Sequence, residues 1–305
     1  MKAEIASLIR CPRCGGRVVP EATDRDERLR CKTCDEIYPV VAGIPRMAIS
    51  TATSRKVAAS FGFQWLARAR TYFERGTLYG LSPDAERRNF LAGLDIDAAD
   101  LQGKIVLDAG CGDGFLLTLV SQYPVTVVGI DISTSVDLAY ERTRRQANAM
   151  VLQADIFAPP LAPEAFDYVW CEGVLVHTED PRKGFGSLSR LVKPGGRLYV
   201  WVYPSERLSI YQRIRDIVRI GHRLPHAVLV PLCYALALPL TVLRRLRHTG
   251  PAESVRTVAF AMFDNLSPIV QTRHRVAEVR SWFEEHGFTA LKQTGHVGMC
   301  GTKVK

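Results

Sequence analysis

The sequence predicts the α/β fold class: a doubly wound, seven-stranded and mostly parallel sheet, with a small metal-binding unit before it and a helical insertion near its end. Three observations predict this. Two C-x-x-C pairs lie within the first 34 residues, apolar strand-like runs alternate with helical segments from residue 105 onward, and one long segment, about 204–260, interrupts that alternation. We therefore expect a ribbon over residues 1–50, a helical lead-in over 51–104, and a core over 105–305 that carries the insertion as a cap.

The composition is that of a globular protein with a positive charge. The 305 residues are 47% apolar and 23% charged, which excludes the disordered, collagen-like and coiled-coil classes. The net charge of +9 suits an anionic partner, either RNA or a membrane surface. Residues 1–10 contain no apolar run typical of a secretory signal, so we expect a cytoplasmic protein.

The first fifty residues have the spacing of a zinc ribbon. Sixteen residues separate the pair Cys11 and Cys14 from the pair Cys31 and Cys34, and a strand-like segment follows each pair. Four thiolates complete a tetrahedron around Zn²⁺ and leave no open position, so we expect the site to be structural rather than catalytic. The alternative is that all four cysteines are free thiols.

A glycine turn marks the start of the core. Residues 105–114 read Ile-Val-Leu-Asp-Ala-Gly-Cys-Gly-Asp-Gly, which predicts a buried strand that breaks into a turn, followed by a helix over 115–122. Glycine allows the backbone of such a turn to approach a ligand closely. The spacing is G-x-G-x-G, and Phe115 stands where the dinucleotide fingerprint requires glycine, which disfavours a dehydrogenase.

The alternation of strands and helices continues to the end of the chain. We expect further strands over 126–130, 149–154, 166–171, 197–203, 288–294 and 298–304. We expect further helices over 135–148, 181–192 and 275–286. Ligands of such sheets bind at the carboxyl ends of the strands, and four acids stand at these ends: Asp108, Asp131, Asp155 and Glu172.

These motifs resemble the class I S-adenosylmethionine-dependent methyltransferases, whose core is Rossmann-like, over about residues 60–305. The two cysteine pairs and the phrase at 38–45 resemble the zinc-ribbon family of methyltransferase activators over about residues 8–49. The resemblance implies a set of cofactor-binding residues. Asp108, Gly110, Cys111, Gly112 and Gly114 would meet the methionine part of S-adenosylmethionine, Asp131 and Ile132 the ribose, and Asp155 and Ile156 the adenine, with Glu172 at the next strand end.

The charges of the motif agree with a cofactor that lacks phosphates. S-adenosylmethionine carries a sulfonium and an ammonium, so a site lined by acids suits it better than one lined by lysines. A phosphate-binding loop requires Lys or Ser/Thr at the start of the helix, where Phe115 and Leu116 stand. The alternatives are that Asp113 caps this helix and that Asp131 and Asp155 are solvated or turn-forming acids.

His177 is the candidate catalytic residue. Methyl transfer depends mainly on alignment and exclusion of water, so an acid or base is optional. His177 follows the strand expected over 166–171, and its ordinary pKa near neutrality suits the deprotonation of a hydroxyl. The alternative is that His177 only caps the short helix before Pro181.

Two other segments contain candidate contacts. The aromatic residues of 61–65 and of Tyr72-Phe73 either cover the cofactor or pack a helix on the sheet. Asp264 and Asn265 either reach the methyl acceptor or form an Asx turn.

The insertion holds most of the positive charge. Residues 204–250 contain eight arginines and two acids, a net charge of +6. The 17 residues 227–243 carry no charge but include Pro231 and Pro239, which predicts two short helical pieces rather than a membrane-spanning helix. Such a segment can lie in a membrane interface, form an apolar cap over the acceptor pocket, or form a dimer surface. RNA binding is less favoured because few aromatic residues are interleaved with the arginines.

The sequence thus predicts an S-adenosylmethionine-dependent methyltransferase with a structural zinc ion. Its acceptor is expected to be a small lipophilic or lipid-linked metabolite that is methylated on oxygen or carbon. We expect peripheral membrane contact through residues 204–250, at the inner face of the membrane. The alternatives are a methyltransferase of rRNA or tRNA bases and a non-catalytic adaptor that uses the ribbon and core as docking surfaces.

Overall fold

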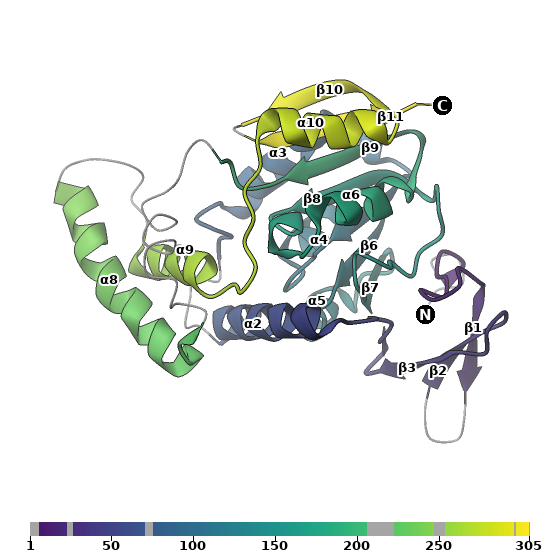
Figure 1. The fold of residues 1–305 in the computed structure, drawn as a ribbon, viewed down its shortest axis with the longest axis horizontal. Coiled ribbons are helices and arrows are strands. Elements are labelled where there is room, and N and C mark those ends of the chain that lie inside the picture. Colours follow the sequence, from purple (N-terminus) through teal and green to yellow (C-terminus); the bar gives the residue numbers. More distant parts are fainter. Residues whose placement is uncertain are drawn as a thin grey trace.

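The computed structural model describes residues 6–22, 27–70, 76–205, 223–246, 254–295 and 297–304. These residues form two sheets with helices around the larger one (Figure 1). Tyr72, Phe73 and five of the eight arginines of the insertion lie outside the described residues. The aromatic contact expected at 72–73 is therefore not addressed by the fold.

The smaller sheet belongs to the cysteine-rich segment. It is antiparallel, with β1 (Val18–Ala22), β2 (Glu27–Cys31), β3 (Ile37–Val41) and β4 (Ile44–Pro45) in that order. Each cysteine pair lies in a tight turn, in which the amides of Gly15 and Asp35 donate back to the carbonyls of Cys11 and Cys31. These turns bring two distant parts of the chain to one place.

The larger sheet has seven strands in the order β10-β11-β9-β8-β5-β6-β7. Their bounds are β5 Ile105–Ala109, β6 Thr126–Asp131, β7 Ala149–Gln153, β8 Phe166–Glu172, β9 Val192–Trp201, β10 Phe288–Thr294 and β11 Gly298–Lys303. Neighbours pair in parallel except for β11, which is antiparallel to both β9 and β10. The chain moves outward from β5 to β7 and then returns to β8, so the order reverses between β5 and β8, where such sheets bind ligands.

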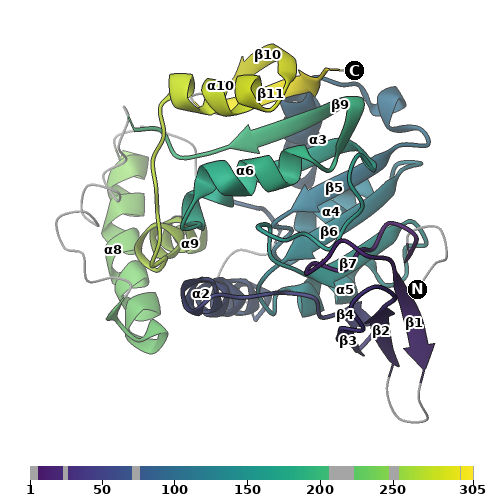
Figure 2. The ribbon, with the colours of Figure 1, turned by 45° about the vertical axis from the view of Figure 1, so that its right-hand side comes forward.

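Helices cover both faces of this sheet (Figure 2). One face packs on α3 (Pro83–Leu94), α4 (Phe115–Val120) and α5 (Val136–Thr143), and the other on α6 (Pro181–Ser189) and α10 (Val276–Glu285). The expected fold class, a doubly wound and mostly parallel sheet, is confirmed. Helix α5 ends five residues earlier than expected. The reason is Asn148, whose side-chain amide donates to the carbonyls of Ser121, Tyr123 and Val125 and so fixes a turn before β7.

The ribbon sheet docks on the β7 side of the large sheet. Met47 N donates to Gln153 O at 2.8 Å, and Ala162 N donates to Leu8 O at 2.7 Å. Ile9 is 1% exposed and belongs to the same apolar cluster as the core strands. The two sheets therefore share buried apolar surface.

The insertion contains one long helix, which corrects the prediction of two pieces. Helix α8 (His226–Leu246) runs for 21 residues through Pro231 and Pro239 and packs on α9 (Val255–Leu266). Both prolines lie on the exposed side of α8, so their rings do not disturb its packing on α9. Packing along the opposite stripe and the strong helix formers between the prolines keep the helix continuous.

Shortening Ile9 tests whether the ribbon sheet shares a core with the large sheet. Ile9→Ala removes buried apolar surface at the junction, so we expect the free energy of unfolding of the whole chain to fall by about 3 kcal/mol. Urea denaturation followed by circular dichroism measures the loss. Ile37→Ala, at an exposed ribbon position (42%), is the matched control and should change little. An equal effect of both variants would contradict the shared core.

Candidate functional site

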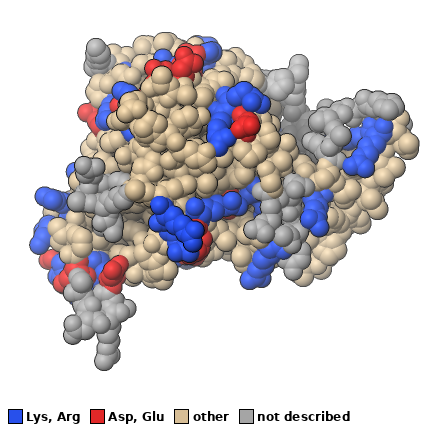
Figure 3. All heavy atoms as spheres, turned by 180° about the vertical axis from the view of Figure 1, so that it is seen from behind, with Lys and Arg blue, Asp and Glu red and all other residues tan. Residues whose placement is uncertain are grey.

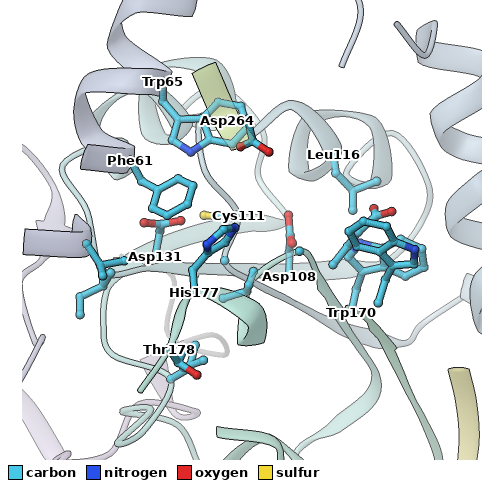
Figure 4. A pocket seen from close by; sticks show the side chains of 18 of the residues that line it. Phe61, Trp65, Asp108, Cys111, Leu116, Asp131, Trp170, His177, Thr178 and Asp264 are labelled. Atoms are coloured by element: carbon cyan, nitrogen blue, oxygen red, sulfur yellow. The ribbon is translucent and has the colours of Figure 1, made fainter. Parts of the chain in front are cut away.

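A cavity of about 610 Å³ lies at the carboxyl ends of β5, β6 and β8, where the strand order reverses (Figure 4). Four separate parts of the chain build its walls: helix α2 (Ala52–Ala69), the segment 78–86 at the start of α3, the strand ends of the core, and helix α9. The lining includes nine of the residues that the sequence singles out: Asp108, Gly110, Cys111, Asp131, Ile132, Asp155, Ile156, Glu172 and His177. The structure thus brings together most of the expected site.

Gly112 and Gly114 shape the turn without lining the cavity. A Cβ at Gly112 would lie 2.7 Å from the Trp65 ring, and one at Gly114 would lie 2.7 Å from the backbone of Ala139. Both have a positive φ, and so does Gly110 (φ 94°), where a Cβ would meet Val174 at 2.1 Å. Side chains are excluded here because the turn is packed from both sides.

Asp131 is held in place by the glycine turn. Its carboxylate accepts hydrogen bonds from Gly112 N at 3.0 Å and from Ser133 N at 2.8 Å. Burial raises the pKa of Asp131, whereas these amide donors lower it. The carboxylate is therefore fixed in orientation at the end of β6.

Asp155 occupies the corresponding position after β7. It accepts from Phe157 N at 2.9 Å, and its pKa is raised by burial. Ile156, the next residue, also lines the cavity. Asp155 thus forms a turn, which was the alternative role for this residue. Its side chain also lines the cavity.

The cavity is rich in carboxyl groups and poor in positive charge. Eight acids line it, and none of the described lining residues is Lys or Arg. Asp108 is 5% exposed, and its Oδ2 has no hydrogen-bond partner in the described structure. Burial, then Asp131, Glu86 and Glu172, raise the pKa of Asp108. Buried acids without a counter-charge favour a cationic ligand.

Two glutamates add to this imbalance. Glu86 of α3 is 2% exposed, and burial raises its pKa to about 6. Burial, with a contribution from Glu86, raises the pKa of Glu172 to about 7. The sequence gave no reason to choose Glu86, because an acid in the first turn of a helix is common for electrostatic reasons alone.

A buried ion triad fastens α2 to the glycine turn. Arg68 is 0% exposed and Asp113 is 1% exposed, and the two form an ion pair that Arg142 joins at 3.0 Å. Asp113 also accepts from Phe115 N, the first residue of α4, at 3.3 Å, but the N-cap of this helix is Gly114, so the alternative that Asp113 is the N-cap is wrong. The positive charge of Arg68 is thereby neutralised behind the turn.

Asp264 joins three parts of the cavity wall. It accepts from Gln64 Nε2 at 2.7 Å, Tyr79 OH at 3.0 Å and Tyr203 OH at 3.1 Å. These donors come from α2, the segment before α3 and the end of β9. Asp264 and Asn265 both line the cavity, in line with the proximity that the sequence allowed. Tyr79 and Tyr203 gave no signal in the sequence, because lone tyrosines have no pattern.

His177 ends the 3-10 helix η2 (Leu175–His177), and its Nδ1 lies 2.9 Å from Val270 O. A carbonyl only accepts, so Nδ1 carries the proton and Nε2 is the basic nitrogen of the neutral ring. The His177 ring lies inside the cavity (Figure 4). Its centroid is 4.8 Å from that of the Phe61 ring and 5.6 Å from that of the Tyr203 ring. The short helix before Pro181 is η2, and its C-cap is Thr178, whereas Asp180 caps the following helix α6 through Lys183 N.

The four ribbon cysteines come together at one point. The Sγ atoms of Cys11, Cys14, Cys31 and Cys34 all lie within 4.8 Å of one another. Tyr38 OH lies 3.1 Å from Cys11 Sγ and adds an outer contact. Sulfur atoms bound tetrahedrally to zinc at about 2.3 Å are separated by similar distances, so the cluster fits a structural zinc ion.

Comparison with known proteins supports the fold and the domain. The sequence profile of a family described as "Methyltransferase domain" matches residues 107–200. Ubiquinone biosynthesis O-methyltransferases are 36% identical over 106 residues (Pseudomonas fluorescens) and 37% identical over 109 residues (Paracidovorax citrulli). Each match covers 34% of this chain, and the chain spans only 46% and 44% of the length of these relatives.

A solved structure extends the similarity in fold. It is the complex that contains the Haloferax volcanii Trm112 methyltransferase activator, with a TM-score of 0.50 and 16% identity over 82% of this chain and 98% of that one. The fold is that of the class I S-adenosylmethionine-dependent methyltransferases. Residues 107–200 match the model of a methyltransferase domain, and a zinc-ribbon-like cysteine cluster precedes them.

The raised pKa values of the glutamates predict how stability depends on pH. Both carboxyls have an ordinary pKa of 4.5, so between about 5 and 7 the unfolded chain loses protons that the folded chain retains. The free energy of unfolding should therefore fall by about 3 kcal/mol as the pH rises through this window. Urea denaturation at a series of pH values measures the fall. Glu172→Gln should make it shallower, and the exposed control Glu141→Gln should not.

Zinc removal tests the ribbon. We expect one zinc ion per chain by elemental analysis, and its loss on chelation or in Cys31→Ser should lower the thermal transition by several degrees. Cys300→Ser, which changes a cysteine outside the cluster, should retain the metal. Full zinc content in Cys31→Ser would contradict the assignment.

Proposed function

We propose that this chain is an S-adenosylmethionine-dependent methyltransferase that acts on a small lipophilic acceptor. The observation that supports it most is the acid-lined cavity at the switch point of a methyltransferase domain. The bound cofactor supplies an electrophilic methyl group on a positively charged sulfur. The acids of the cavity, without Lys or Arg among its described lining residues, compensate that charge.

Each carboxyl group has a distinct task in this proposal. Asp131, oriented by Gly112 N and Ser133 N, accepts hydrogen bonds from the ribose hydroxyls. Asp155 accepts a hydrogen bond from the exocyclic amine of adenine, and the backbone of Ile156 lies against the adenine ring. The unpartnered Oδ2 of Asp108, with Glu172, binds the ammonium group. These roles are those that the resemblance to the class I methyltransferases implies, and the position of each acid near a strand end is compatible with them.

Lipophilic character comes from the remaining wall. Aromatic and aliphatic side chains line the cavity beside the acids: Val57, Phe61, Trp65, Leu78, Leu81, Val174 and Trp201. Such a wall excludes water from the reacting atoms, which methyl transfer requires. The relatives named as ubiquinone biosynthesis O-methyltransferases support a small molecule and an oxygen atom as acceptor.

His177 acts as the base in this proposal. A hydroxyl that gains a methyl group must lose its proton, and Nε2 of His177 is the nitrogen able to take it, since Nδ1–H is bound to Val270 O. Phe61 and Tyr203 hold the ring in position.

The two alternatives receive less support. RNA carries a phosphate at every nucleotide, and a cavity lined by eight acids repels it. An adaptor without catalysis would have no need of a buried carboxylate oxygen, Asp108 Oδ2, that is left without a partner at the switch point.

Cofactor binding tests the proposal through Asp131. Zinc-loaded protein should bind S-adenosylmethionine in calorimetric titration, and Asp131→Ala should weaken binding roughly thirtyfold through the loss of the ribose hydrogen bonds. Asp131→Asn keeps one acceptor for the turn amides and separates misfolding from loss of binding, and Glu141→Ala is the exposed control. No binding by the native chain, or binding by Asp131→Ala as tight as by the native chain, would refute the function as proposed.

A further inference from the structure

One side of helix α8 is buried and the other is exposed and apolar. Leu229, Cys233, Ala237 and Thr241, spaced by four residues, form the buried stripe. The exposed side carries large apolar residues whose exposure ranges from 40% to 74%: Val228, Leu232, Leu236, Leu238, Val242, Leu243 and Leu246. Only 22% of its most apolar 18-residue window is buried. Contiguous apolar surface of this kind marks a contact site.

The charges around this surface point to an anionic contact. The stretch 223–246 contains Arg223, Arg244 and Arg245 and no Asp or Glu. Figure 3, seen from behind, shows the part of the surface formed by α8 at the right as tan and blue, without red. Basic residues at the ends of an apolar helix face suit phosphate head groups above acyl chains. A second copy of α8 would offer these arginines no acid to meet.

Several contacts hold α8 to the protein along its length. The His226 ring lies 4.2 Å from Phe63 of α2 and 5.5 Å from Phe263 of α9, which fixes the start of the helix. The buried stripe packs against α9 in a shared apolar cluster. Among the described residues, α8 is the helix long and apolar enough to cross a membrane, but crossing would require lipid around its whole circumference and would break these contacts.

The two prolines also favour a shallow position. Pro231 and Pro239 lack an amide hydrogen, so the carbonyls of Ala227 and Ala235, both on exposed residues, lose their donors within the helix. In hydrocarbon such carbonyls are costly, whereas at head-group depth water can reach them.

We propose that α8 lies flat on an anionic phospholipid bilayer, with its exposed apolar face in the acyl boundary and its arginines on the head groups. This inference rests on the proposed function in one respect: helix α9, which packs on α8, also lines the cavity through Ala261, Asp264 and Asn265. Docking through α8 therefore places the cavity beside the bilayer, where a lipophilic acceptor is dissolved.

Vesicle sedimentation tests the docking with the full, zinc-loaded chain. The probes are vesicles of phosphatidylcholine alone and vesicles that also contain phosphatidylglycerol. We expect binding to the anionic vesicles that weakens as salt rises and is much weaker on neutral ones. The double variant Leu232→Glu/Leu236→Glu should reduce binding at least tenfold, because it places charge in the acyl boundary. Ile49→Glu/Val304→Glu adds the same charge at exposed apolar sites away from α8 and should bind normally.

A tryptophan placed in α8 reports how deeply this helix lies in the bilayer. None of the four tryptophans of the chain lies in α8, so Leu236→Trp adds one on the apolar face. Lipids brominated along the acyl chain should quench this tryptophan and leave the fluorescence of the native chain nearly unchanged.

Three results would overturn the proposal. The first is no binding of the native chain to anionic vesicles, and the second is equal binding by the α8 and control double variants. The third is a dimer in sedimentation that only the α8 variant dissociates, which would assign the face to a second copy. Calorimetry with S-adenosylmethionine keeps the two proposals apart: normal cofactor binding without vesicle binding refutes only the docking, and the converse refutes only the function.

Discussion

The burial of carboxyl groups at the switch point constrains the rest of this structure. Asp108, Glu86 and Glu172 surround one cavity, and each has a pKa raised above its ordinary value because water is excluded. The buried guanidinium of Arg68 is paired with Asp113 at the glycine turn. The described protein residues thus supply no counter-charge to the carboxyl groups of the cavity, and a ligand can supply it.

Helix α2 turns this arrangement into an enclosed site. Trp65 lies against Gly112, and Gln64 donates to Asp264, so a single turn of α2 contacts both the glycine turn and α9. Tyr79, from the segment before α3, also donates to Asp264 of α9. A pocket built from several distant parts of the chain forms only when all of them have folded, so its shape depends on the stability of the whole fold.

The sequence predicted the parts of the site that backbone geometry dictates. Asp108 and Asp131 follow buried strands, and the glycines between them need positive φ, so their positions can be derived from periodicity and turn chemistry. Glu86 and Tyr203 reach the cavity through tertiary packing, which leaves no periodic signal. Helix α8 shows the same limit. Proline propensity predicted a break, but the stripe at Leu229 and Cys233 packs on α9 and outweighs it.

The docking of the ribbon has a consequence for the lifetime of the folded chain. Strand β7 is an edge of the large sheet, and an open edge is a template for pairing with another molecule. Arg46 forms a parallel β-bridge with Gln153 on this edge, and the amide of Met47 donates a hydrogen bond to the carbonyl of Gln153. The segment that follows the ribbon strands therefore covers the carboxyl end of this edge. Unfolding of the ribbon would expose this part of β7 to pairing with another molecule.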